Sequence, residues 1–382
     1  MPSLWSSSAA RALGRGIVCA GIGIGSAQAQ TPPTLDAQAW LLVDHHSGSV
    51  LTEHHADRPL PPASLTKLMT AYLAFERLRA GLLRLTDPVR VSGHAASAPA
   101  SRLYLRAGES VTVEELLKGM VVRSANDAAV ALAEHIAGSE AAFAALMNER
   151  AQAWGMTRTH FVNATGLDRP GHISTARDMS RITSALIRDF PDYYAWFALK
   201  QYAYHKARQY NSNALLWRDD SVDGVKTGHT RGAGFCLVAS AKRGDMRLIA
   251  TVLGARDDGG RLDAAQRLLD YGFRTFETRL VYAANRPATQ ARVWMGETDQ
   301  LALGVTENLY VTLPRGWYDK LRPQLTIDAA LQAPVKQGQK LGVLALKLEE
   351  QVLGEYPLVA LQEIGTGGLF QRTLDSVRLW FH

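Results

Sequence analysis

Three short polar motifs constrain the fold of this 382-residue chain more than any other feature of its sequence. Ser64-Leu65-Thr66-Lys67 opens a segment whose apolar residues have helical spacing, and Ser124-Ala125-Asn126 falls in a loop between two predicted helices. Lys226-Thr227-Gly228 falls on a predicted strand. Chance would rarely place all three in this order and in these elements, so we expect them to belong to one site.

The first motif alone supplies a nucleophile and a base. At positions i and i+3 of a helix, the Ser64 hydroxyl and the Lys67 amine share one face. A serine is a poor nucleophile until a base removes its proton. A lysine can be that base only when burial or a neighbouring cation lowers its pKa. Because this pattern by itself is common in helices, the other two motifs carry the specificity.

In this order, the three motifs resemble the signature of penicillin-binding proteins and serine β-lactamases. From about Ala39 to Glu277, the chain resembles the low-molecular-mass penicillin-binding proteins that act as serine D-Ala-D-Ala carboxypeptidases (peptidase family S11). Segments that carry the likeness include PASLTKLMTAYLAFERL, TVEELLKGMVVRSANDAAVALAE and VDGVKTGHT. The resemblance implies removal of the terminal D-alanine from peptidoglycan stem pentapeptides, covalent inhibition by β-lactam antibiotics, and no cofactor or metal.

The resemblance also implies a role for each catalytic residue. Ser64 would attack the carbonyl between the two D-alanines, and Lys67 would accept its proton. Lys226 would be a nearby cation that helps to lower the pKa of Lys67. Ser124 would bridge the two lysines and relay a proton to the leaving amine.

The residues that the resemblance assigns to substrate binding are Asn126, Lys226, Thr227, Gly228, His229 and Arg261. Asn126 would offer its amide to the peptide backbone, and the backbone N–H groups of Ser64 and His229 would form an oxyanion hole. The strand from Lys226 to Thr230 would pair with the extended peptide. Thr227, Lys226 and Arg261 would meet the substrate carboxylate, with Arg256 as a second possibility for the arginine.

Two positions depart from the family pattern. Ala125 stands where glycine is common, and its small side chain should be tolerated. Ser212 stands where a similar segment often carries arginine, which removes a cation from the edge of the expected site. The second departure bears on affinity for the carboxylate or the substrate, and it leaves the nucleophile unaffected.

The N-terminus predicts export. Residues 1–29 have the form of a secretory signal peptide, with Arg11 and Arg15, an apolar run at residues 16–25 and an A-x-A cleavage site at residues 27–29. Cleavage would leave 353 residues and one cysteine, Cys236, which we expect to be a buried residue of a central strand. An exported chain without disulfides suggests a bacterial envelope enzyme, which the resemblance places at the periplasmic face of the inner membrane.

The order of predicted elements indicates an α+β fold. Residues 30–275 combine helices with an antiparallel meander of strands, which the resemblance identifies as a penicillin-binding-protein/β-lactamase-like transpeptidase domain. Residues 276–364 read as a small all-β domain of short alternating segments separated by turn residues. Its predicted strands lie at 290–294, 308–313, 323–328, 339–347 and 352–360.

Residues 365–382 predict an amphipathic helix. On a helical wheel, the apolar arc contains Leu369, Phe370, Thr373, Leu374, Val377, Trp380 and Phe381. Arginines lie on the opposite side, a distribution typical of a helix at a membrane surface. The alternative is a helix packed on the β domain that precedes it.

Several other kinds of site find no support in the sequence. His45-His46 and His54-His55 lack the H-x-x-x-H spacing of a zinc peptidase, so we expect no metal. The net charge of +6 comes from scattered basic residues without a Lys/Arg-rich block, which argues against nucleic acid as a partner. No apolar run approaches the roughly 20 residues of a membrane-spanning helix.

Three rival functions stand beside the carboxypeptidase. A D,D-endopeptidase of the same fold would cut cross-links, but such relatives usually lack the β domain and the terminal helix. A β-lactamase would need a deacylating glutamate segment between Asn126 and Lys226, which the sequence does not offer. A non-catalytic wall-binding scaffold would have no need of the intact Ser64, Lys67 and Ser124.

Overall fold

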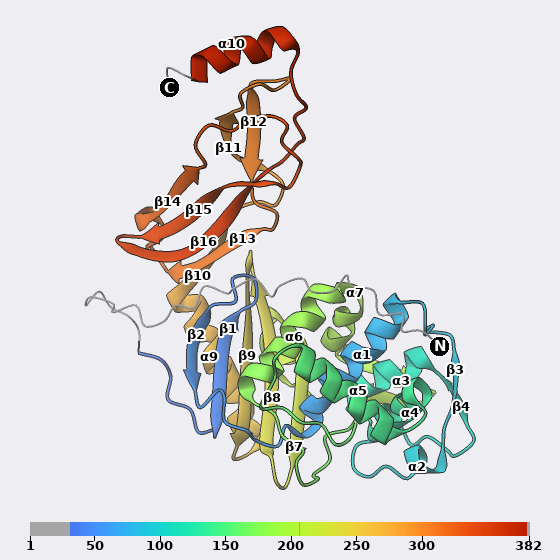
Figure 1. Ribbon diagram of the computed structural model, residues 1–382. Coiled ribbons are helices and arrows are strands. Elements are labelled where there is room, and N and C mark those ends of the chain that lie inside the picture. The colour runs from blue at the N-terminus through green and yellow to red at the C-terminus, as the bar shows by residue number, and fades with distance from the viewer. Residues whose placement is uncertain (1–30, 206, 380–382) are drawn as a thin grey trace. The chain divides into compact units, whose positions relative to one another are not determined.

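The computed structural model describes residues 31–205 and 207–379, so the predicted signal peptide at residues 1–29 lies outside the described residues. The chain divides into two compact units (Figure 1). The first unit comprises residues 31–45 and 50–274. The second comprises residues 275–379 together with the turn at residues 46–49.

A five-stranded antiparallel sheet forms the centre of the first unit, with the strand order β2-β1-β9-β8-β7 (Figure 1). The strands are β1 (Ala39–Asp44), β2 (Val50–His54), β7 (Val222–Thr230), β8 (Gly234–Arg243) and β9 (Met246–Ala255). The predicted N-terminal hairpin and the predicted meander are both confirmed. Because β7 is the last strand of this sheet, one side of its backbone faces away from the other strands.

Helices cover both faces of this sheet. Side chains alternate between the faces along β9. Thr251 faces α6 (Ala176–Asp189), where its hydroxyl hydrogen-bonds to Ser180 at 2.7 Å. Leu248 faces α9 (Asp258–Thr275), which packs so closely that a Cβ at Gly272 would lie 2.5 Å from it. Burial on both faces explains why β8 and β9 read as nearly continuous apolar runs.

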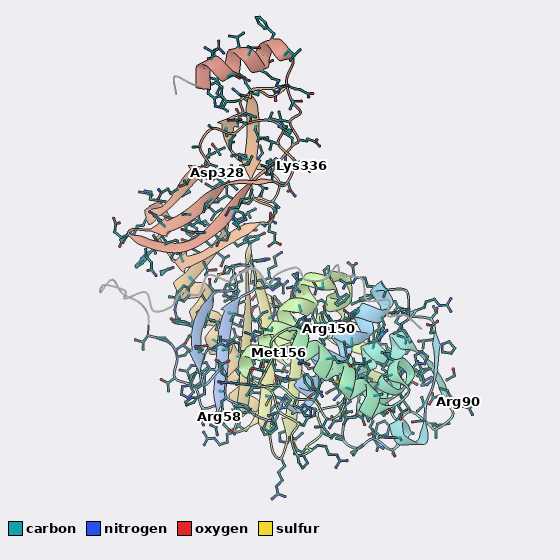
Figure 2. The ribbon with its side chains drawn as sticks, viewed as in Figure 1. Arg58, Arg90, Arg150, Met156, Asp328 and Lys336 are labelled. Carbon is teal, nitrogen blue, oxygen red and sulfur yellow. The ribbon has the colours of Figure 1, made fainter. Side chains whose placement is uncertain are left out.

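The other helical elements of the first unit are η1 (Ala63–Thr66), α1 (Lys67–Arg79), α2 (Gly93–Ala96), α3 (Val113–Arg123), α4 (Asn126–Ala137), α5 (Glu140–Ala153), α7 (Pro191–Tyr194), η2 (Ala195–Ala198) and α8 (Leu215–Arg218). The α1 helix is buried from Lys67 to Phe75. Arg150 of α5, labelled in Figure 2, fixes the C-terminal part of α1 by donating two hydrogen bonds to the Glu76 carboxylate at 2.6 and 2.7 Å.

The start of α3 has the predicted capping box. Glu115 donates its backbone N–H to the Thr112 hydroxyl, and its carboxylate accepts from the Thr112 backbone N–H at 3.0 Å. Four short strands were not predicted, namely β3 (Pro88–Arg90), β4 (Ser110–Thr112), β5 (Gln201–Tyr204) and β6 (Ala207–Tyr210). Strands this short show too little alternation to be read from a sequence.

The second unit consists mainly of strands. β10 (Phe276–Tyr282) pairs with β13 (Leu309–Pro314), and a five-stranded sheet has the order β11-β12-β16-β15-β14. Its strands are β11 (Pro287–Arg292), β12 (Gln300–Gly304), β14 (Leu321–Ile327), β15 (Lys340–Leu348) and β16 (Gln351–Ala360); a short turn, η3 (Tyr318–Lys320), precedes β14. All five predicted strands are present with shifted ends, whereas β10 and β12 were not predicted. An apolar core of its own includes Leu301, Leu303, Leu344 and Leu346.

The predicted terminal helix is present as α10 (Leu369–Leu379). Asp375 is only 6% exposed and accepts a hydrogen bond from the Met295 backbone N–H at 2.9 Å. Leu369 and Phe370, by contrast, are each 82% exposed. The polar side therefore contacts the β-rich unit while apolar side chains face outward. Trp380 and Phe381, which belong to the predicted apolar arc, lie outside the described residues.

No single helix in the described part of the chain is long and apolar enough to cross a membrane. The consecutive helices α4 and α5 meet that criterion only together, by length and composition, and they are bent by 81°.

Candidate active site

Ser64 lies in the 3-10 turn η1, which leads directly into α1. The predicted helix start at Ser64 is therefore tighter than an α-helix, and α-helical structure begins at Lys67. Side chains three residues apart are eclipsed in a 3-10 turn. Accordingly, the Nζ atom of Lys67 lies 3.0 Å from the Oγ atom of Ser64.

The Lys67 amine is almost completely buried, with 1% of the residue exposed. It donates hydrogen bonds to Ser64 Oγ, to Asn126 Oδ1 at 2.6 Å and to the Thr165 carbonyl at 2.7 Å. The Asn126 and Thr165 oxygens only accept hydrogen bonds, so they hold two N–H groups in either protonation state. When the amine is neutral, its lone pair is left facing Ser64, whose hydroxyl can then donate to it.

Burial lowers the pKa of Lys67 to about 7, while the carboxylates of Glu140 and Asp127 act in the opposite direction. Lys226 was expected to lower this pKa, but it is not among the groups that do so. The pKa of Lys226 itself is held well below its usual value by burial and by repulsion from Lys67 and Arg261. Burial is therefore the main reason that a neutral lysine base is available near neutral pH.

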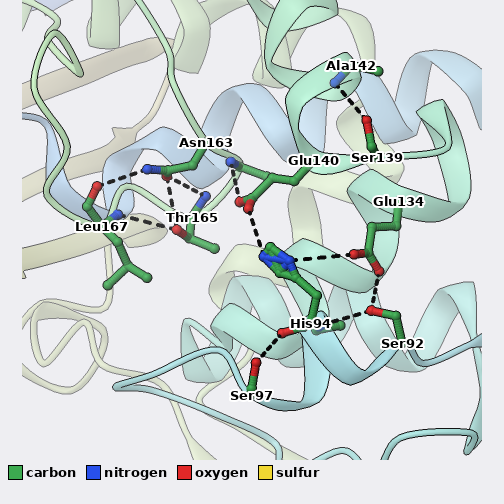
Figure 3. Close-up of polar contacts among 12 residues, drawn as sticks. Ser92, His94, Ser97, Glu134, Ser139, Glu140, Ala142, Asn163, Thr165 and Leu167 are labelled. Carbon is green, nitrogen blue, oxygen red and sulfur yellow. Dashed lines mark hydrogen bonds and ion pairs between the residues drawn. The ribbon is translucent and has the colours of Figure 1, made fainter.

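Glu140, the first residue of α5, belongs to a polar network that includes His94 and Glu134 (Figure 3). Its Oε1 atom accepts a hydrogen bond from the Ala164 backbone N–H at 3.0 Å, and its Oε2 atom lies 3.5 Å from Nε2 of His94. Ala164 directly precedes Thr165, whose carbonyl holds the lysine amine. Glu140 thus positions the backbone next to that carbonyl and also adds a negative charge near Lys67.

The side chain of Asn163 fixes the same loop from within (Figure 3). Its Oδ1 atom accepts from the backbone N–H groups of Thr165 at 3.1 Å and Gly166 at 2.7 Å, and from the Thr165 hydroxyl at 3.0 Å. Its Nδ2 atom donates to the Leu167 carbonyl at 2.9 Å. This closed turn holds the Thr165 carbonyl ready for the lysine.

His172 ties the loop to the nucleophile segment. Its Nδ1 atom accepts from the Val162 backbone N–H at 3.0 Å, so the ring proton is on Nε2 and is donated to the Thr66 hydroxyl at 2.8 Å. Burial lowers the pKa of His172 to about 4. The imidazole is therefore neutral at physiological pH and serves as a fixed link between the two segments.

The second motif supplies the loop next to Lys67. Ser124 ends α3 in the left-handed region, with φ of 65°, and Asn126 begins α4. The Asn126 Nδ2 atom donates to the Pro99 carbonyl at 2.7 Å, so both ends of the amide are engaged. Among the residues that the structure describes, the Ser124 hydroxyl makes no hydrogen bond to either lysine. Asn126 thus supports the base directly, a contact not foreseen from the sequence.

The third motif lies on the edge strand β7. Lys226 is 1% exposed and donates to the Thr227 carbonyl at 2.9 Å, and the Thr227 hydroxyl hydrogen-bonds to that of Ser212 at 2.6 Å. A Cβ at Gly228 would lie 3.0 Å from the Ser64 backbone nitrogen. Glycine therefore lets the β7 backbone approach the nucleophile, which brings the third motif to the first as expected.

Arg261, on α9, contacts the backbone of β7 and β8. Its guanidinium donates to the carbonyls of Gly228 at 2.9 Å and Cys236 at 3.2 Å, and it pairs with Asp258. Its Nε atom is buried and has no hydrogen-bond partner within the described residues. These contacts hold the backbone of the third motif.

The remaining predicted residues lie as follows. His229 is exposed on β7 and stacks on Phe235 with 4.0 Å between ring centroids. Arg256 is exposed and pairs with Asp36. Cys236 is fully buried in β8, as predicted.

No group of three or more His, Cys, Asp or Glu side chains in the described chain is arranged to hold a metal ion. His54 stacks on Trp40, with ring centroids 4.2 Å apart, and also contacts His55.

Comparison with known proteins shows the family of this chain. A family model described as D-alanyl-D-alanine carboxypeptidase matches residues 26–257, and one described as penicillin-binding protein 5, C-terminal domain, matches residues 276–366. The chain belongs to the D-alanyl-D-alanine carboxypeptidase family. It is 43% identical over 358 residues to the D-alanyl-D-alanine carboxypeptidase DacC of Escherichia coli (strain K12), covering 92% of this chain and 90% of that protein.

Two solved structures of penicillin-binding proteins match different lengths of this carboxypeptidase chain. Penicillin-binding protein 5 from Haemophilus influenzae matches with a TM-score of 0.82 and 37% identity, covering 88% of this chain and 99% of that chain. Penicillin-binding protein D2 from Listeria monocytogenes, in its ampicillin-bound form, matches with a TM-score of 0.59 and 33% identity, covering 63% of this chain and all of that chain. The carboxypeptidase fold and enzyme class inferred from the three motifs are therefore confirmed.

Four residues that hold the Lys67 amine or the segments around it in this carboxypeptidase were not singled out from the sequence: Glu140, Asn163, Thr165 and His172. Thr165 acts through its carbonyl, which every residue type possesses, so no sequence pattern marks it. In the sequence, Glu140 is the first residue of a predicted helix and His172 is an isolated histidine, and neither pattern indicates a role beside Lys67 or Ser64. Asn163, four residues before Leu167 in a Gly-containing loop, had the composition of a turn.

Proposed function

We propose that Ser64 and Lys67 carry out the removal of the terminal D-alanine from peptidoglycan stem pentapeptides through an acyl-enzyme. The observation that carries this proposal is the position of the Lys67 amine, whose Nζ atom lies 3.0 Å from Ser64 Oγ. The Asn126 Oδ1 atom and the Thr165 carbonyl hold the amine there in both its neutral and its protonated form. A buried amine with a pKa of about 7 can both accept and return a proton near neutral pH.

In the acylation step, Ser64 Oγ attacks the carbonyl carbon between the two D-alanines. Its proton passes to the lone pair of Lys67. The oxyanion that forms accepts hydrogen bonds from the backbone N–H groups of Ser64 and His229. The close approach of Gly228 to the Ser64 nitrogen supports this pairing of donors, because His229 follows Gly228 on the same strand.

Collapse of the tetrahedral intermediate breaks the carbon–nitrogen bond and releases D-alanine. The proton on Lys67 returns to the leaving amine, with the Ser124 hydroxyl as a relay once substrate has entered. Water then loses a proton to Lys67 and attacks the ester, which restores the Ser64 hydroxyl. β-Lactam antibiotics would acylate Ser64 by the same first step.

The substrate carboxylate is assigned to the neighbourhood of Thr227 and Lys226. A carboxylate there would favour the protonated form of Lys226, which in the free site is opposed by burial and by Lys67. Arg261 would contribute to substrate binding by holding the β7 backbone in place, and Asn126 would contribute by positioning the Lys67 amine. The peptide itself would lie along the outer edge of β7 as an added strand.

The proposed location is the periplasmic face of a bacterial inner membrane. The predicted signal peptide at residues 1–29 would direct export, with residues 30–275 and 276–364 forming the catalytic and β-rich domains of the mature enzyme. The outward-facing apolar side chains of α10 support peripheral attachment to the membrane surface.

The test is an assay of the purified mature protein with a pentapeptide that ends in D-Ala-D-Ala. We expect D-alanine release by the wild type, none by Ser64→Ala, and covalent labelling of the wild type by penicillin. Cleavage of cross-linked muropeptide dimers without D-alanine release would instead indicate the endopeptidase. Absence of both D-alanine release and penicillin labelling would overturn the proposal and favour a non-catalytic scaffold.

A further inference from the structure

His94 lies on α2 between two carboxylates from neighbouring helices (Figure 3). Its Nε2 atom is 3.5 Å from the Oε2 atom of Glu140 on α5, and its Nδ1 atom is 3.8 Å from the Oε1 atom of Glu134 on α4. The side chain of His94 is 57% exposed, whereas both glutamates are mostly buried. The ring can therefore exchange protons with the solution while it faces two carboxylates.

Both carboxylates are also held by groups other than the ring. The Ser92 hydroxyl, at the start of α2, donates to the Oε2 atom of Glu134 at 2.6 Å. The Ala164 backbone N–H donates to the Oε1 atom of Glu140 at 3.0 Å. A neutral imidazole has a proton on only one nitrogen, so its other nitrogen turns a lone pair toward a carboxylate. The protonated ring turns an N–H group toward each carboxylate, and the arrangement therefore fits an imidazolium.

Glu140 connects this histidine with the catalytic base. Burial lowers the pKa of Lys67 to about 7, and the negative charge of Glu140 opposes that lowering. Glu140 also holds Ala164, and the next residue, Thr165, accepts a hydrogen bond from the Lys67 amine through its carbonyl at 2.7 Å. A positive charge on His94 lies within ion-pair distance of the same carboxylate, so it offsets the effect of Glu140 on the amine.

Three other titratable groups interact with Lys67, and all of them are buried: Asp127 of α4, Lys226 of β7 and His172. Burial lowers the pKa of His172 to about 4, so its ring stays neutral in mildly acidic solution. Burial and repulsion from Lys67 both oppose the protonated form of Lys226. Histidine is the side chain whose charge ordinarily changes between pH 5 and 8, and His94 is the exposed histidine of this set.

We propose that His94 is a positioning residue for the reaction: when it gains a proton, it offsets the charge of Glu140 and so keeps the Lys67 amine able to accept the Ser64 proton in mildly acidic solution. The inference rests on the proposed function, because it takes Lys67 as the base. His94 does not touch the reacting atoms and acts through Glu140. Without the imidazolium, the negative charge of Glu140 would hold a proton on the base as the solution becomes acidic.

The test measures the rate constant for penicillin acylation between pH 5 and 9 in the wild type, His94→Gln and His94→Lys. For His94→Gln we expect the midpoint to rise by roughly half a pH unit, which lowers the rate at pH 6 about threefold. His94→Lys carries a positive charge throughout this range, so its midpoint should equal that of the wild type or lie below it. The rates above pH 8.5 should be the same in all three proteins, because the base is neutral there and the site remains folded.

His135→Gln is the matched control. His135 is an exposed histidine of α4, directly after Glu134, and it acts on Asp87 instead. Its profile should match that of the wild type. An unchanged midpoint in His94→Gln, or an equal rise in His94→Gln and His94→Lys, would overturn the role of the His94 charge and leave the carboxypeptidase intact. Absence of penicillin labelling in the wild type would instead count against the proposed function.

Discussion

The protonation state of Lys67 should control the rate of acylation. Because burial lowers the pKa of this amine to about 7, the base is protonated and inactive below that pH and neutral above it. We expect the second-order rate constant for penicillin acylation to rise with pH and to level off above a midpoint near 7. The rate is measured by stopped-flow or gel labelling between pH 5 and 9. A profile that stays flat over this range would contradict the assignment of Lys67 as the base.

Glu140 should set the position of that midpoint. Its negative charge raises the pKa of Lys67, and its Oε1 atom accepts from the Ala164 backbone N–H. Glu140→Gln keeps an acceptor for that N–H but removes the charge, so the midpoint should move to lower pH. Glu149→Gln, at an exposed position of the same helix, is the control and should leave the profile unchanged. A midpoint that stays in place or rises would exclude this electrostatic role.

His172 should make the protein sensitive to acid. In the native state burial lowers its pKa to about 4, whereas an unfolded histidine titrates near 6.5. The unfolding free energy it supports is therefore complete above pH 6.5 and falls as the pH drops toward 4, by up to about 3 kcal/mol. Denaturant titrations at pH 7 and pH 4.5 should show a smaller drop for His172→Gln than for the wild type. An equal drop in both proteins would assign the acid sensitivity elsewhere.

At the scale of elements, the contact between β7 and η1 should be more important for activity than for stability. Gly228→Ala places a Cβ 3.0 Å from the Ser64 nitrogen and 3.1 Å from the Pro62 carbonyl, which forces the two elements apart. We expect acylation to slow by roughly tenfold to a hundredfold with a modest decrease in melting temperature. Gly93→Ala is the control, since nothing lies within 4 Å of its Cβ. Normal acylation by Gly228→Ala would show that this approach is not needed.

The three motifs predicted which elements meet, but they did not predict how the polar atoms pair. Helical spacing placed Ser64 and Lys67 on one side, and the short distance between them depends on the 3-10 turn, which the sequence does not distinguish from a first α-helical turn. The acceptor carbonyl of Thr165 is 98 residues away from Lys67 in the chain. Contacts of that kind come from tertiary packing, which local patterns cannot reveal.

The strands were predicted where alternation or continuous apolar runs are long. β8 and β9 have ten residues each and were found, whereas β10 was missed because Glu277 and Arg279 interrupt its apolar residues beside the end of α9. The amphipathic α10 was predicted correctly, but not the burial of Asp375 against Met295. A helical wheel gives the faces of a helix without saying which face meets a neighbour.

For the whole molecule, we expect α10 to determine attachment to the membrane surface and to have little effect on the catalytic rate. Leu369→Ser combined with Phe370→Ser removes two of its most exposed apolar side chains, so binding to anionic phospholipid vesicles should be lost. D-Alanine release from a soluble pentapeptide should stay within twofold of the wild type. Gln371→Ser on the polar side is the control for vesicle co-sedimentation. Vesicle binding by the double variant equal to that of the wild type would assign membrane attachment to another surface.

The edge position of β7 also bears on whether the protein aggregates. An unpaired sheet edge accepts almost any extended chain and is a common starting point of aggregation. Here Gly228 lies against η1, and Thr230 is hydrogen-bonded to Asp168, so other segments of the chain lie close to β7 at both of these residues. We expect these neighbouring segments to leave room for a single extended peptide but not for the sheet of a second molecule, so the same edge that binds substrate would resist aggregation.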